Sequence, residues 1–136
     1  GYPLLVIGEA SLADLNSRLD SPLPMNRFRP NIVVRGSAAF AEDDWAELRV
    51  GEAAFRATKP CARCVMTTVD QSTGEFDGKE PLKTLASYRM AKDVMPERLE
   101  SLGVSDGAVL FGQNLIPESV GAEISVGDSV EVIKYY

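Results

Sequence analysis

Hydrophobic and polar residues alternate along this chain in short blocks, and most of the blocks have the length and composition of β-strands. Single strands are predicted at residues 4–7, 32–34, 65–69 and 108–111. Two hairpins are predicted as well, one over residues 45–58 with Val50-Gly51 at its turn, and one over residues 123–135 with Gly127-Asp128 at its turn. Turn residues at such short spacing are typical of antiparallel β-proteins.

Helical patterns are fewer and shorter than the strand patterns. Ser11 is a typical N-cap residue and begins a helix whose apolar positions 12, 15 and 19 form one stripe. Pro81 is typical of a first helical turn and begins a second helix, which runs to about Arg89. A third, short helix is expected over residues 95–102, ending at Gly103. The predicted fold class is mainly β: a mostly antiparallel barrel or sandwich with a few peripheral helices.

The length of 136 residues favours a single domain with a real hydrophobic core. No apolar run approaches the roughly 20 residues that a membrane span needs. The start of the chain also lacks the charged-then-apolar pattern of a secretory signal. We therefore expect no membrane association and a cytoplasmic location. Because the first residue is Gly1 rather than Met, we expect the natural polypeptide to continue on the N-terminal side.

The formal net charge of −6 argues against a general nucleic-acid-binding protein, which would carry a basic excess. Cationic residues nevertheless gather in the first half of the chain, at Arg27, Arg29, Arg35, Lys59 and Arg63. If these residues meet in the fold, they form a local cationic pocket suited to a small anionic ligand. The alternative is ordinary surface charge in contact with water.

The low number of cysteines and the lack of histidine limit the reactions that this chain could catalyse. Two cysteines in 136 residues do not make a disulfide scaffold, which agrees with a reducing compartment. The chain contains no histidine, which excludes Ser-His-Asp and Cys-His catalysis and the zinc sites that use imidazole. An enzyme of this composition would work with a thiolate, carboxylates, cationic side chains or a cofactor.

The two cysteines form a Cys-x-x-Cys motif at Cys61 and Cys64. Such a motif is half of a zinc site, a dithiol redox pair, or two core cysteines. A zinc site needs four ligands, and a thioredoxin-like pair needs a βαβ context, which the pattern lacks. Lys59 before the motif and Arg63 inside it would stabilise a thiolate at Cys64. Core cysteines remain the alternative.

A second candidate segment covers residues 26–31. Arg27 and Arg29 lie two residues apart on a turn stiffened by Pro30, and this arrangement suits bidentate contacts with phosphate or carboxylate. The alternative is a loop in which both arginines pair with nearby Asp and Glu residues.

Several spaced motifs together resemble one family. Residues 27–34 read Arg-Phe-Arg-Pro-Asn-Ile-Val-Val, residues 42–45 read Glu-Asp-Asp-Trp, and residues 59–70 read Lys-Pro-Cys-Ala-Arg-Cys-Val-Met-Thr-Thr-Val-Asp. Further agreement lies at residues 11–16, 73–74, 80–89, 110–113 and 126–128. The sequence resembles the MOSC domain family, and in it the branch of the mitochondrial amidoxime-reducing component and its bacterial relatives. The resemblance implies a MOSC-type β-barrel over residues 1–136.

The resemblance also implies roles for single residues. Cys64 falls on the position that ligates molybdenum in the family, which makes it the metal ligand and the catalytic residue. Arg29, Ala62 and Arg63 fall on cofactor-contacting positions, and Arg27 lies near the same pocket. Cys61 falls outside the first coordination shell of the metal, so no ligand role is assigned to it. Asp70 closes the last motif and has either a turn-forming or a catalytic role.

The implied function is that of an oxidoreductase domain that binds the molybdenum cofactor (molybdopterin) and reduces N-hydroxylated substrates such as amidoximes. Electrons would come from external partners, either a flavin or an iron–sulfur reductase. Two departures from the family stand against independent activity. The N-terminal region that completes the cofactor pocket is missing, and so are the cysteines of the C-terminal iron–sulfur domain that some bacterial relatives carry. The domain is therefore expected to act as a reductase only when complete.

Two other functions stay open. MOSC domains also end the molybdenum-cofactor sulfurases, so the chain is alternatively a sulfur-carrier or cofactor-binding module, with pyridoxal phosphate only in a separate partner domain. Those proteins usually place a further cysteine where Thr68 stands, which favours the reductase branch. The last alternative is a folded domain that no longer binds a cofactor and serves as an interaction surface.

Overall fold

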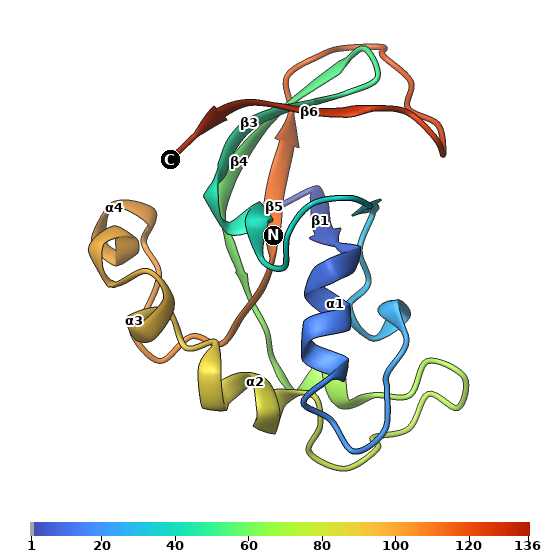
Figure 1. Cartoon of the computed structure of the whole chain (residues 1–136), viewed down its shortest axis with the longest axis vertical. Helices are drawn as coiled ribbons and strands as arrows, with labels where there is room; N and C mark the ends of the chain where they lie inside the picture. The colour runs from blue at the N-terminus through green and yellow to red at the C-terminus, as the bar shows by residue number, and fades with distance from the viewer. Residues whose placement is uncertain (1) are drawn as a thin grey trace.

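The computed structural model describes residues 2–136, and its centre is one curled, six-stranded sheet with short helices outside it (Figure 1). The strands are β1 Leu4–Gly8, β2 Ile32–Val34, β3 Trp45–Val50, β4 Ala53–Ala62, β5 Leu110–Pro117 and β6 Val130–Tyr135. Their order in the sheet is β2-β1-β5-β4-β3-β6. The β1–β2 pair is parallel and the other pairs are antiparallel. The predicted fold class is confirmed, and the sheet curls into half of a barrel.

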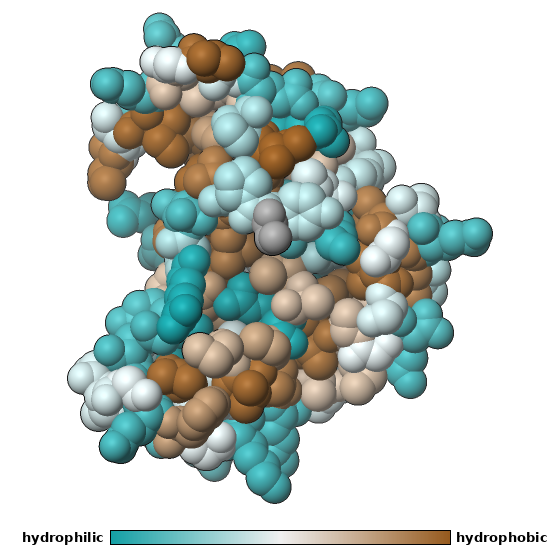
Figure 2. All heavy atoms as spheres, turned by 180° about the vertical axis from the view of Figure 1, so that it is seen from behind, coloured by the Kyte–Doolittle hydropathy of each residue, from teal (hydrophilic) through white to brown (hydrophobic). Residues whose placement is uncertain are grey.

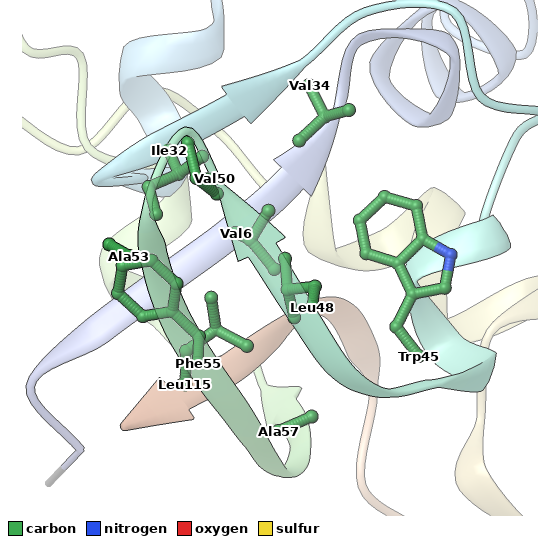
Figure 3. Close-up of a cluster of buried hydrophobic side chains, with 10 residues drawn as sticks. All are labelled: Val6, Ile32, Val34, Trp45, Leu48, Val50, Ala53, Phe55, Ala57 and Leu115. Atoms are coloured by element: carbon green, nitrogen blue, oxygen red, sulfur yellow. The ribbon is translucent and has the colours of Figure 1, made fainter. Parts of the chain in front are cut away.

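The main core fills the concave face of this sheet. Apolar side chains from several strands point toward one another there (Figure 3). The cluster consists of Val6, Ile32, Val34, Trp45, Leu48, Val50, Ala53, Phe55, Ala57 and Leu115. Since alternate strand residues point to opposite faces, a period-two pattern brings Ala53, Phe55 and Ala57 of β4 into this core. In β3 an irregularity between Trp45 and Leu48 lets both of these side chains enter the core although they are three residues apart.

The first predicted hairpin is confirmed as β3 and β4, which pair from Val50 with Ala53 to Glu47 with Arg56. Gly51 has φ +56° at the turn, a left-handed conformation that glycine adopts without steric cost. β4 is longer than predicted and reaches Ala62, because β5 pairs with it as far as Ala62 and Leu110. β5 also runs beyond residue 111, to Pro117. This long β4–β5 pair carries the cysteine motif to the end of the sheet.

The second predicted hairpin is wrong. Residues 123–126 form no strand, and β6 pairs instead with β3, for example through Val132 and Leu48. A glycine turn shows that the chain reverses at Gly127-Asp128 but does not show which strand receives β6.

The first helix, α1 Glu9–Asn16, begins two residues before Ser11, so Ser11 is not its N-cap. The Ser11 hydroxyl is instead buried in the protein. It donates a hydrogen bond to Glu42 Oε1 (2.5 Å) and accepts one from the Phe40 N–H (2.8 Å). Of the predicted apolar stripe, Leu15 is fully buried, while Leu12 and Leu19 are partly buried against the same cluster. Leu19 itself lies beyond the end of the helix.

The other helices lie between β4 and β5 along the chain. The second predicted helix is confirmed as α2 Leu82–Tyr88. The third is divided into a 3-10 turn, η4 Pro96–Arg98, and α4 Leu99–Leu102, and it ends at Gly103 as predicted, with φ +66°. An additional short helix, α3 Ala91–Val94, precedes it. No helix in the described part of the chain is long and apolar enough to cross a membrane.

A buried acidic turn, η2 Ala41–Asp44, joins the sheet to the helices. Glu42 accepts hydrogen bonds from the Gly8 N–H (3.1 Å) and from Ser11 at the β1–α1 junction. Asp43 forms an ion pair with Arg89 (2.7 Å), in which the two side chains are only 7% and 5% exposed. Arg89 also donates to the Leu110 carbonyl in β5 (3.1 Å). Burial raises the pKa of Asp43, and the Arg89 charge opposes that rise.

Replacing Arg89 by alanine should therefore lower the free energy of unfolding by about 3–5 kcal/mol, because Asp43 would keep a buried and unbalanced charge. Since the native pKa of Asp43 is raised, the stability that this carboxyl contributes is largest in acid and falls as the pH rises through that pKa. The loss in Arg89→Ala should accordingly be smaller near about pH 4 than near neutrality.

Urea unfolding at both pH values measures this effect, with Arg56→Ala as the control. Arg56 pairs with Glu118 at 2.8 Å, but both side chains are 50% exposed, so its loss should cost less than about 1 kcal/mol. Equal losses in the two variants would contradict the role given to the buried pair.

Candidate functional site

A pocket of about 200 Å³ lies where β4 ends. Its lining residues are Arg27, Arg29, Cys61, Ala62, Arg63, Cys64, Met66 and Thr67. All five residues that the sequence analysis assigned to a cofactor site are among them, so the structure brings the two candidate segments together. Met66 and Thr67 were not assigned from the sequence, since they lay in a segment predicted as strand.

Two of the five cationic residues lie elsewhere. Arg35 lines a different hollow, with its guanidinium 3.6 Å from Glu9 and 89% exposed. The Lys59 ammonium lies 5.8 Å from the centre of the Tyr2 ring, and Lys59 does not line the pocket. The cationic cluster is therefore made by three arginines rather than five cations.

Backbone hydrogen bonds fix the position of Cys64. The Arg63 N–H donates to the Val109 carbonyl (2.7 Å), which extends the β4–β5 ladder by one residue. Cys64 is still extended, and the chain then turns into η3 Val65–Thr68. Thr67 donates to the Cys64 carbonyl with both its N–H (3.1 Å) and its hydroxyl (2.9 Å). The thiol thus projects from a backbone that is held on both sides.

The strand predicted at residues 65–69 is wrong, because η3 is a 3-10 turn. Its two threonines are buried and bond to the local backbone, Thr67 to Cys64 and Thr68 to the Val65 carbonyl (2.7 Å). Threonine hydroxyls that satisfy main-chain carbonyls in this way compete with sheet pairing and override the β-propensity of the run.

The two cysteines differ in their surroundings, and both are free thiols. Cys64 is exposed, and no hydrogen bond involves its Sγ among residues 2–136. Cys61 is partly buried, packs against the cluster around Phe28, and accepts a hydrogen bond from Arg63 Nη1 (3.2 Å). Arg63 Nη2 donates to the Phe28 carbonyl (2.7 Å). The guanidinium that was expected to stabilise Cys64 is therefore bonded to the other cysteine.

The opposite wall of the pocket comes from η1 Met25–Phe28 and the residue that follows it. Phe28 is fully buried and packs on Phe111, with 4.4 Å between the ring centres, so the turn is anchored in a second core cluster. Arg29 then adopts a left-handed conformation with φ +54° and is exposed. A non-glycine residue in this region is strained, and here the strain accompanies a pocket-lining guanidinium.

Arg27 is only 4% exposed and is held by two partners. It donates to Asp77 Oδ2 (2.8 Å) and, at the longer distance of 3.5 Å, to the Thr67 carbonyl. Asp77 belongs to an exposed loop but is anchored by its own N–H, which donates to the Thr68 carbonyl (2.8 Å). Sequence reasoning missed Asp77, since nothing local distinguishes it from the other polar residues of that loop.

Asp70 serves the turn that follows η3. Its carboxylate accepts hydrogen bonds from the Ser72 N–H (2.8 Å) and hydroxyl (2.7 Å), and its carbonyl accepts from the Gly74 N–H (2.8 Å). The hydrogen bond from the Ser72 hydroxyl is the main cause of the lowered pKa of Asp70. Because Asp70 does not line the pocket, the geometry supports the turn-forming alternative.

The donor set of this pocket is one exposed thiol beside three guanidinium groups. Among residues 2–136, no three His, Cys, Asp or Glu side chains are grouped to hold a metal ion. Of the two thiols that line the pocket, Cys64 is the exposed one. Thiolates prefer soft metals, and guanidinium groups bind phosphate in a bidentate way. The pocket therefore fits a ligand that joins a thiophilic metal to an anionic tail. Complete ligand pockets measure about 300–1,000 Å³, so a pocket of about 200 Å³ has room for only part of such a ligand.

Comparisons with known proteins agree with the motifs. The MOSC domain model matches residues 1–131. The chain is 45% identical over 131 residues to mitochondrial amidoxime-reducing component 1 of Homo sapiens, covering 96% of this chain and 37% of that protein. It is 44% identical over 128 residues to mitochondrial amidoxime reducing component 2 of Bos taurus, covering 94% and 36%. The chain spans little more than a third of the length of these relatives. The resemblance stated from the motifs is confirmed.

The different settings of the two cysteines predict different reactivity. A maleimide should label Cys64 at least about tenfold faster than Cys61, because Cys64 is exposed and Cys61 is half-buried and hydrogen-bonded. Mass spectrometry of labelled peptides over time measures both rates. Cys64→Ser should remove the fast phase, and the matched variant Cys61→Ser should keep it. A fast phase that survives in Cys64→Ser would contradict this geometry.

Proposed function

Because the chain belongs to the MOSC domain family, we propose that it is the molybdenum-cofactor-binding domain of an oxidoreductase that reduces N-hydroxylated substrates. The observation that carries this proposal is the meeting of two distant segments in one pocket. Cys64 and its neighbours come from the end of β4, while Arg27 and Arg29 come from η1, and all of them line the same cavity. The relatives are named for the reduction of amidoximes, which supports this substrate class.

In this proposal Cys64 is the thiolate ligand of molybdenum and the catalytic residue. The bound cofactor would supply two-electron redox chemistry at the metal. Cys64 is suited to hold that metal because its carbonyl is fixed by two hydrogen bonds from Thr67, so the direction of its side chain is restricted. Its exposure leaves room for a small substrate to approach the same place.

The three arginines would bind the anionic part of the cofactor. Arg29 is exposed and available for bidentate contacts with a phosphate group. Arg63 is held by the Phe28 carbonyl, which places its charge at the edge of the pocket with little freedom. The charge of Arg27 is partly balanced by Asp77, so it would act mainly as a positioning group. The backbone at Ala62 would complete the contacts just before the ligand.

The domain organisation and the partners are part of the proposal. We propose that residues 1–136 are a MOSC domain whose cofactor pocket is completed by a further region of the polypeptide, as its small volume suggests. In this proposal electrons come from a separate flavin or iron–sulfur reductase, as the resemblance implies. The cytoplasmic location stays a prediction, and the relatives are named as mitochondrial proteins.

The sulfur-carrier function has one observation in its favour, namely the exposed and unbonded thiol of Cys64, which could accept a persulfide sulfur. Thr68 argues against it. The side chain at this position is 2% exposed and bonds to the Val65 carbonyl, so it serves the turn and offers no second thiol to the pocket.

Metal analysis tests the ligand first. The polypeptide that carries residues 1–136 with its natural flanking sequence, produced in a host that makes the cofactor, should contain near-stoichiometric molybdenum. Cys64→Ser should lose almost all of it, because the serine oxygen is a poor ligand where a soft thiolate is needed. Cys61→Ser is the matched control and should retain the metal. Molybdenum absent from the parent, with persulfide on Cys64 after exposure to a sulfur donor, would favour the carrier function.

An activity assay tests the substrate class. With a reducing partner and an amidoxime substrate, the loaded protein should form the corresponding amidine. Arg29→Ala should lower the rate by roughly 10–100-fold through weaker cofactor binding. Arg49→Ala changes an exposed arginine in β3 that lies outside the pocket, and it should keep the parent rate. No reduction by a fully loaded protein would overturn the proposed substrate class without affecting the assignment of Cys64.

A further inference from the structure

The curled sheet is open between its two edge strands, β2 and β6. A hollow of about 1150 Å³ occupies this opening, and residues 31–38 line one side of it while residues 124–130 line the other. The hollow shares no lining residue with the cysteine pocket. Seen from behind, the surface is notched beneath the loop that precedes β6, with apolar atoms above the notch and hydrophilic atoms below it (Figure 2).

The opening reaches down to the main core of the protein, whose buried side chains form its base. Ile32, Val34, Trp45 and Val50 belong to that core and also line the hollow. Around them, further apolar side chains are exposed to water: Val33 (46%), Ile124 (41%), Val126 (109%) and Tyr135 (60%). Apolar patches of this kind on a folded domain mark a surface that something covers.

The backbone at both edges has free hydrogen-bonding groups. The Asn31 N–H donates to the Leu5 carbonyl in β1, and since successive residues of a strand face opposite sides, Ile32 and Val34 direct their N–H and C=O groups away from β1. The Ser129 carbonyl likewise accepts from Gly51 beside β3, so Val130 faces away from that strand. Within the described residues, no strand pairs with the outer side of β2 or β6.

The size of the hollow corresponds to one strand. A strand residue takes up about 3.3 Å along the chain, about 4.8 Å across the sheet and about 10 Å through it, which is roughly 160 Å³. A hollow of about 1150 Å³, open on one side, is therefore large enough for one strand of ordinary length, about five to seven residues. Strands of this length are common in barrels, and β3 and β6 have 6 residues each.

We propose that an extended segment with alternating apolar residues lies between β2 and β6 as an additional strand and closes the half-barrel. The segment belongs to the same polypeptide, outside residues 1–136. The relatives support this source, since the matched region makes up only 36–37% of their length. A covalently attached segment also has an effective concentration in the millimolar range, so a single strand is enough to fill the opening. The proposal goes beyond the cofactor pocket and does not depend on it.

A second copy of the chain fits the opening less well. A two-fold symmetric contact can pair an edge strand of one copy with either edge strand of the other, but it inserts no strand into either hollow. Each hollow of about 1150 Å³ would then keep its volume unfilled.

Hydrogen–deuterium exchange on the polypeptide with its natural flanking sequence tests the proposal. The amides of Ile32, Val34 and Val130 should exchange at least about 100-fold more slowly than amides of the exposed loop at residues 120–123. A peptide outside residues 1–136 should show matching protection, because it would donate and accept the other halves of these hydrogen bonds. Exchange of the three amides at the rate of the loop would overturn the proposal.

Two lysine variants supply a matched comparison. Val126 and Val120 lie on the same loop and are both fully exposed, at 109% and 103%, but only Val126 lines the hollow. Val126→Lys should speed exchange in β2 about tenfold by placing a charge against the inserted segment, whereas Val120→Lys should leave it unchanged. Equal effects of the two variants, or protection that rises with protein concentration, would overturn the proposal, and the second of these results would identify a second copy as the occupant.

Discussion

The burial of two adjacent carboxylates, Glu42 and Asp43, is the constraint on which the arrangement of the other segments depends. A buried carboxylate is costly unless donors converge on it, and the donors here come from two distant places in the chain. Gly8 and Ser11 supply them at the β1–α1 junction, and Arg89 supplies them after α2. The same Arg89 bonds to the carbonyl of Leu110, the residue that pairs with Ala62 at the end of β4.

This chain of contacts leads directly to the cysteine pocket. With β5 held by the acidic turn, β4 is paired up to the residues just before Cys64, and the Thr67 hydrogen bonds hold the residues just after it. The thiol therefore lies at the junction of a rigid strand and a rigid turn. The arginine wall is more irregular, since it depends on the left-handed backbone of Arg29 and on the buried ring of Phe28. Local irregularity at such a site is common where function competes with regular structure.

The pocket and the barrel opening are separate features with a similar physical character. In each of them, one wall consists of buried side chains and hydrogen-bonded backbone, and the opposite side is open to water. In the pocket the open side exposes charge and a thiol, which suits a small anionic group. In the opening the exposed side chains are apolar and the backbone is free, which suits an extended chain. The surface chemistry thus distinguishes a ligand site from a packing surface.

Local residue patterns were enough to predict the β3–β4 hairpin, the helix that follows Pro81 and the turn at Gly103. The resemblance of spaced motifs was enough to predict five of the residues that line the cysteine pocket. Tertiary structure decided the strand that pairs with β6, the buried partner of Ser11 and the turn at residues 65–68. It also decided the pairing of Arg27 with Asp77, 50 residues away, and of Arg63 with the Phe28 carbonyl, 35 residues away. A residue pattern records what a side chain prefers, whereas the identity of a distant partner follows only from how the whole sheet curls.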